Sequence, residues 1–137
     1  GGYQMMFKTL RDDCGVENTE PCVEEGLSFI DDEIVFLPQK SVVKGRYEID
    51  GSTVSGYEIH CGVSKKFPLY CRGDGFFGTH LHALFDDDGF RERFFAPFVS
   101  KYEGYNFLEQ KKEALKSFSK AVKQNIDYKK IIEAVLC

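Results

Sequence analysis

Apolar and polar positions change their spacing near the middle of the chain. Before that point the apolar residues come in short runs separated by turn residues, at residues 34–37, 41–49 and 53–60. Short runs of this kind predict β-strands, and the Asp50-Gly51 pair favours a tight hairpin between the last two. Two further short strands are predicted at the positions that flank Gly73-Asp74-Gly75, residues 69–71 and 76–81.

The remaining segments are predicted as helix or loop. Residues 4–10 are predicted to form the first turns of a helix, and residues 12–25 a polar loop. After residue 85 the spacing becomes helical: acidic residues at 86–88 are candidate N-caps, and Pro97 should end or kink the helix that follows. Two more helices are predicted, one over residues 108–124 with a single apolar face and one that Asp127 caps.

Composition limits the classes of partner. With 137 residues, 42% of them hydrophobic and 29% charged, the chain has the length and make-up of one globular domain. A net charge of −4 gives no reason to expect a nucleic-acid partner. No apolar run approaches the roughly 20 residues that span a bilayer, so no membrane partner is expected. Five scattered cysteines fit reduced thiols, and thus a cytoplasmic protein.

Histidines are the first candidates for chemistry. His82 ends a predicted strand, where a neutral imidazole could move a proton, although it could equally be a histidine at the edge of the core. His80 should share a strand face with His82, which raises the alternative of a metal-binding module completed by a cysteine. The ligand spacing typical of such modules is lacking, so no metal is predicted.

A second polar pair lies on the preceding predicted strand. Glu58 and His60 share a face there, where they could hold a polar substrate or orient a catalytic histidine, or simply lie on a solvated edge. The start of the chain suggests a nucleophile: Gly1-Gly2 running into an apolar helix resembles the second half of a nucleophile elbow. The nucleophile would be the residue just before Gly1.

Three motifs in order resemble the glutaminase domain of the cobyric acid synthases, a class I-type glutamine amidotransferase domain. In that family the elbow reads Cys-Gly-Gly-Tyr-Gln-Met, which residues 1–5 match after the cysteine. Residues 56–62 match Gly-Tyr-Glu-Ile-His-Met-Gly, with Cys61 for Met, and residues 78–85 match Gly-Thr-Tyr-Leu-His-Gly-Leu-Phe, with His80 for Tyr and Ala83 for Gly. The resemblance implies an α/β, flavodoxin-like fold of which residues 1–137 are a C-terminal portion, short strands followed by helices.

The resemblance also implies roles for individual residues. The cysteine would attack the carboxamide of glutamine, and His82 would be its base and then the acid for the departing ammonia. The Gly1 N–H would form half of an oxyanion hole, and Gln4, Glu58 and His60 would contact substrate. Where related enzymes carry His-x-Glu this chain has His82-Ala83-Leu84, so a Cys-His dyad is expected, with Glu58 or Asp86 as weaker orienting candidates.

Partners and cofactors follow from the same resemblance. Ammonia would pass to an N-terminal synthetase domain that uses ATP and Mg²⁺ to amidate a corrin, adenosyl-cobyrinic acid a,c-diamide, in cobalamin biosynthesis. The glutaminase portion itself would need no cofactor. Without the nucleophile, residues 1–137 are expected to be inactive alone. The alternative is a non-catalytic amidotransferase-like module that binds a ligand without turnover.

Overall fold

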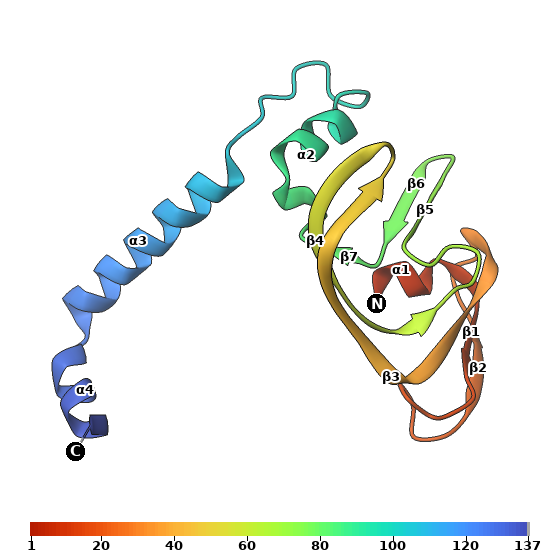
Figure 1. Ribbon diagram of the computed structural model, residues 1–137, viewed down its shortest axis with the longest axis horizontal. Coiled ribbons are helices and arrows are strands. Elements are labelled where there is room, and N and C mark those ends of the chain that lie inside the picture. Colours follow the sequence, from red (N-terminus) through yellow and green to blue (C-terminus); the bar gives the residue numbers. More distant parts are fainter. Residues whose placement is uncertain (137) are drawn as a thin grey trace. The chain divides into compact units, whose positions relative to one another are not determined.

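The computed structural model describes residues 1–136, and the chain divides into two compact units, Gly1–Leu84 and Phe85–Cys137. The first unit is mostly β-structure (Figure 1). One sheet has the strand order β2-β1-β3-β4-β7 and a separate hairpin pairs β5 with β6. Its elements are α1 (Gly2–Met5), β1 (Phe7–Asp12), β2 (Cys22–Glu25), β3 (Ile30–Ile49), β4 (Ser52–Val63), β5 (Tyr70–Gly73), β6 (Phe76–Thr79) and β7 (Leu81–His82).

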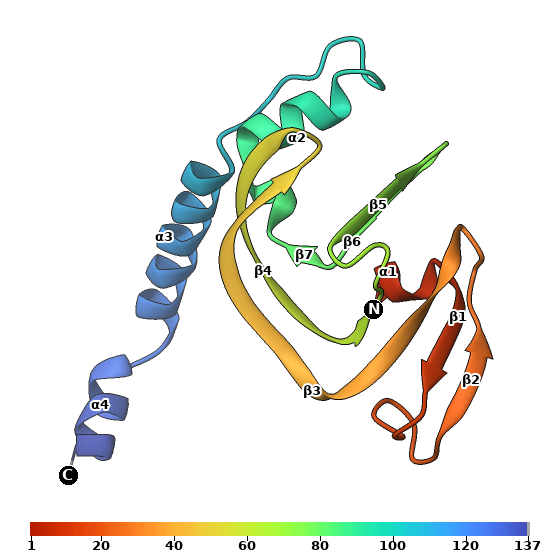
Figure 2. The ribbon, with the colours of Figure 1, turned by 45° about the vertical axis from the view of Figure 1, so that its right-hand side comes forward.

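A long curved ribbon of β3 and β4 dominates this unit. The predicted Asp50-Gly51 hairpin is confirmed: both residues have positive φ, 50° and 70°, as two-residue turns between twisted strands require. The strands predicted at residues 34–37 and 41–49 form one continuous strand, β3. The pairing of β3 with β4 shifts register between Phe36 and Ser41. A bulge there lets β3 pass through Pro38, which cannot donate to a ladder. Figure 2 shows α1 inside the curve of this ribbon.

The helix predicted for residues 4–10 was wrong beyond its first turn. The helix ends at Met5, and Phe7 begins β1, which pairs in parallel with β3 through Phe7 and Ile30. The Phe7 side chain is completely buried by this pairing, so tertiary packing outweighs local helix preference. The predicted loop at 12–25 likewise ends in β2, which pairs antiparallel with β1.

Tyr3 anchors α1 to the core. Its ring is buried in a cluster with Phe7 and Ile34, and its hydroxyl donates a hydrogen bond of 2.9 Å to the Phe67 carbonyl oxygen. Burial raises the pKa of Tyr3, so the hydroxyl remains a donor. Because Tyr3 lies within α1, the same contacts fix the residues on either side of it, Gly1 to Gln4.

The second unit is helical. After the short 3₁₀ segment η1 (Leu84–Asp86) come α2 (Asp88–Phe95), α3 (Phe107–Asn125) and α4 (Tyr128–Leu136). Asp87 is the N-cap of α2, accepting from the Phe90 N–H at 2.7 Å, and α2 ends before Pro97, as predicted. The Asp127 carboxylate accepts from the Lys130 N–H at the start of α4, which confirms the second predicted cap.

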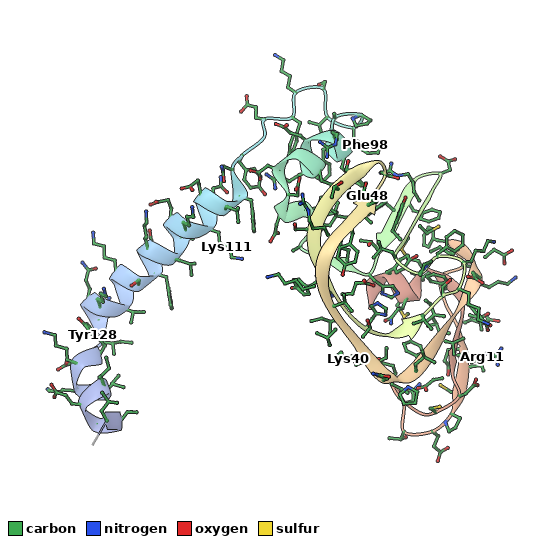
Figure 3. All side chains as sticks on the ribbon, viewed as in Figure 1. Arg11, Lys40, Glu48, Phe98, Lys111 and Tyr128 are labelled. Carbon is green, nitrogen blue, oxygen red and sulfur yellow. The ribbon has the colours of Figure 1, made fainter. Side chains whose placement is uncertain are left out.

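Arg91 holds the loop between α2 and α3. Its buried guanidinium donates to the carbonyl oxygens of Phe85 and Tyr105 and to the Asp88 carboxylate. Asp88 also accepts from the Phe107 N–H at 3.1 Å, which ties the start of α2 to the start of α3. By contrast, α3 buries none of its residues within the described chain, and Figure 3 shows its side chains, with Lys111 labelled, projecting around the helix.

The predicted class is confirmed: the fold is α/β, and the strands precede the C-terminal helices. The strands β3 and β4 are longer than predicted, and β1 with β3 is the one parallel pair among the strands of residues 1–136. No helix in that range combines the length and apolar character needed to cross a bilayer.

Candidate active site

A cavity of about 120 Å³ lies in the first unit between α1, β4 and the segment that enters β7. Four of the residues predicted for the site line it together, although they lie up to 81 positions apart in sequence. They are Gly1, Gln4, His60 and His82, and the remaining lining residues are Gly2, Tyr3, Ile59, Thr79, His80 and Leu81. The fifth predicted residue, Glu58, reaches the site through its contact with His60.

A bend before β7 decides where the histidines point. The Thr79 hydroxyl donates to the Leu69 carbonyl oxygen and accepts from the Leu81 N–H, both at 3.0 Å, and the His80 N–H also donates to Leu69. This turn, of a kind that threonine favours, interrupts the strand at His80. The alternation that would have put His80 and His82 on one face is therefore lost, and that prediction was wrong.

His80 is buried against other rings. Its imidazole stacks on His60 with ring centroids 3.7 Å apart, and the Tyr3 ring meets it edge-on at 4.6 Å. Burial is the main reason that the pKa of His80 falls to about 3, and positive charge on His60 lowers it further. His80 is thus neutral near pH 7. Its Nε2 is buried without a hydrogen-bond partner among the described residues.

His60 is held at both ring nitrogens. Nδ1 lies 2.8 Å from the Gly62 carbonyl oxygen and Nε2 lies 3.0 Å from the Glu58 carboxylate. A carbonyl oxygen only accepts, so Nδ1 carries a proton, and Nε2 also donates when His60 is an imidazolium paired with the carboxylate. The His60 side chain is only 8% exposed, so this pair forms a fixed wall on which the His80 ring rests.

His82 has a different environment. It pairs with Tyr57 across β4 and β7, and the two rings stack with centroids 5.0 Å apart. His82 is exposed, and within residues 1–136 its ring has no hydrogen-bonded carboxylate. Glu58, proposed as an orienting residue, binds His60 instead, and Asp86 belongs to the second unit. His82 therefore lines the cavity with its ring supported by stacking on Tyr57.

The start of the chain forms the opposite wall. Gly1 is the N-cap of α1, and its carbonyl oxygen accepts from the Met5 N–H at 3.2 Å. The Gln4 side chain extends toward Gly62: a Cβ added at Gly62 would lie 2.5 Å from Gln4 Nε2 and 2.6 Å from a methyl group of Ile34. Only glycine leaves room for Gln4 at this point.

The cysteines lie apart from this chemistry. Cys14, Cys22, Cys61 and Cys71 are free, and Cys137 lies outside the described residues. Burial raises the pKa of the Cys71 thiol, which makes it a poor nucleophile. In the described part of the chain, no group of three or more His, Cys, Asp or Glu side chains is placed to hold a metal ion.

The first two thirds of the chain match the model of a known protein family. Residues 1–90 match the model of the CobB/CobQ-like glutamine amidotransferase domain. The chain belongs to this family. The matched range contains every residue that lines the cavity.

Several curated relatives are named cobyric acid synthase. The chain is 38% identical over 135 residues to a cobyric acid synthase of Acinetobacter baylyi, covering 98% of this chain and 29% of the relative. It is 30% identical over 157 residues to a probable cobyric acid synthase of Methanosarcina barkeri (98% and 32%) and 32% identical over 167 residues to a cobyric acid synthase of Clostridium botulinum (97% and 33%). The chain thus spans about a third of each relative's length. No solved structure matches it.

Sequence reasoning missed how His60, His80 and Tyr3 contact one another. These residues come from α1, from β4 and from the bend before β7, and nothing in their spacing predicts that their rings meet. The one available signal was that His80 stands where the family motif has tyrosine, which marked the position without giving its neighbours.

Proposed function

We propose that this chain is the glutaminase part of a cobyric acid synthase, which releases ammonia from glutamine. One observation carries the proposal: the helix start Gly1 to Gln4 and the histidine of the third family motif, His82, line the same cavity. The family match and the relatives named cobyric acid synthase support the same reaction class.

The proposed chemistry uses the two walls of the cavity. In the family motif a cysteine precedes Gly1, and its sulfur would attack the carboxamide carbon of glutamine. His82 would take the thiol proton and return it to the departing nitrogen, which leaves a thioester and free ammonia. Water, deprotonated by the same imidazole, would then hydrolyse the thioester to glutamate. The Gly1 N–H would stabilise the negative charge that develops on the carbonyl oxygen.

The remaining residues would shape the pocket for glutamine. Gln4 of α1 lies against Gly62 of β4. On the same strand, His60 is fixed by Glu58. Because His82 has no carboxylate partner among the described residues, we infer a Cys-His dyad in which stacking on Tyr57 sets the ring orientation.

The ammonia would serve an amidation carried out by another part of the protein. Relatives about three times the length of this chain are named cobyric acid synthase, so we place the ATP- and Mg²⁺-dependent amidation of corrin carboxylates outside residues 1–137. Residues 1–137 alone, without the cysteine, should not hydrolyse glutamine.

The test is a His82→Ala variant of the protein as its gene encodes it. Loss of the base should lower glutamine-dependent amidation by at least about 10²-fold, in the range of general-base effects, while amidation driven by added ammonium salt stays unchanged. Amidation driven by ammonium salt is the internal control for folding and for the synthetase reaction. Undiminished glutamine-dependent turnover in His82→Ala would refute the role of His82. Glutamine binding without hydrolysis in the wild type would favour a non-catalytic binding module.

A further inference from the structure

Within the described residues, one buried polar atom of a residue that lines the cavity has no hydrogen-bond partner. His80 is 7% exposed, it lines the cavity, and its Nε2 is buried without a hydrogen bond among residues 1–136. Leaving a buried nitrogen without a hydrogen bond destabilises the folded state, so such atoms are uncommon in proteins and call for an explanation.

The ring that carries this atom cannot turn at low cost. It is stacked on His60 on one side, met edge-on by Tyr3 on another, and its backbone N–H is bonded to Leu69. His60 is itself fixed by Glu58 and Gly62. Nε2 is therefore held in place before any ligand enters, which reduces the ordering cost of binding.

The ligand group that fits is a neutral amide. His80 is uncharged near pH 7, since burial lowers its pKa to about 3, so its Nε2 can form one uncharged hydrogen bond. A carboxamide offers both a carbonyl acceptor and N–H donors and suits either tautomer.

We propose that His80 Nε2 hydrogen-bonds the side-chain carboxamide of bound glutamine and so helps this site select glutamine. This inference rests on the proposed glutaminase function and adds a contact that the motif, with tyrosine at this position, does not assign. His80 would be a substrate-binding residue, whereas the proton transfers belong to His82.

The test compares variants at position 80 in the protein as its gene encodes it. His80→Phe keeps a flat ring between His60 and Tyr3 but removes Nε2. It should raise KM for glutamine about tenfold, the equivalent of one lost hydrogen bond, and leave ammonia-dependent turnover unchanged. His80→Gln places an amide nitrogen near the position of Nε2 and should restore most of the lost affinity.

If His80→Phe does not fold, the comparison of His80→Gln with His80→Asn still tests the proposal. The His80→Asn amide matches the position of Nδ1 rather than Nε2, so its KM for glutamine should be about tenfold higher than that of His80→Gln. Equal KM values for the variants and the wild type would overturn the role of His80 while leaving the glutaminase function standing. A wild-type protein that does not hydrolyse glutamine would overturn both.

Discussion

His82 stacks on Tyr57 and is exposed, whereas His80 is buried and His60 is bonded at both ring nitrogens. An imidazole that serves as a base must accept and release a proton without breaking contacts that hold it. His60 would lose its bond to Glu58 or Gly62, and His80 would have to become charged inside the core. The surroundings therefore favour His82 for proton transfer and the other two for binding.

Ala83, the residue after His82, is in a strained conformation. Its φ is 64°, in the left-handed region that favours glycine, and the family motif has glycine at this position. Ala83→Gly should raise the free energy of unfolding by about 1 kcal/mol, because the relief of strain outweighs the added freedom of the unfolded chain. Urea unfolding of the two proteins measures this. A less stable variant would mean that the alanine methyl group packs favourably enough to offset its backbone strain.

Local signals predicted the elements that local chemistry controls. The Asp50-Gly51 turn and the Asp87 cap were found from the sequence because one or two residues decide each of them. The strand β1 was missed because its formation depends on Phe7 meeting Ile30, 23 positions away. Contacts between distant residues also limit what the sequence predicts at the cavity. His82 and Gly1 were predicted to lie together there, but the contact of His80 with His60 depends on the bend at Thr79.

The cap of α2 gives a test at the level of one helix. Asp87 accepts from the Phe90 N–H, one of the donors that a helix start leaves unpaired. Asp87→Ala should cost about 1 kcal/mol and lower the thermal midpoint by several degrees. Asp86→Ala is the matched control, since it removes the same charge one residue earlier, outside the cap. Equal midpoints for the two variants would show that the cap does not stabilise α2.

On the scale of the whole molecule, the proposed chemistry belongs to one unit. Every residue lining the cavity lies in Gly1–Leu84, and the family match ends at residue 90. The second unit contributes apolar surface instead. On α3 and α4, large apolar side chains are exposed: Leu108, Leu115, Phe118, Ile131, Ile132, Val135 and Leu136. Apolar patches of this kind mark surfaces that associate.

Association of residues 1–137 should therefore depend on the apolar face of α3. Phe118→Asp places a charge within that face and should shift the chain toward monomer in sedimentation velocity experiments at tens of micromolar. Ser117→Asp is the control, because helical spacing puts residue 117 about 100° away from residue 118 and on the polar side, with the same change in charge. A wild-type chain that sediments as a monomer would contradict this expectation.

The contacts of Arg91 have a practical consequence for protein engineering. Since Arg91 and Asp88 tie Tyr105 and Phe107 to the start of α2, the ends of the intervening loop stay together whatever its length. Lengthening a loop with fixed ends is inexpensive, about 0.6 kcal/mol for each doubling. The exposed peptide between Ser100 and Lys101 is thus a position where an epitope tag or a fluorescent reporter can be inserted without unfolding the helices on either side.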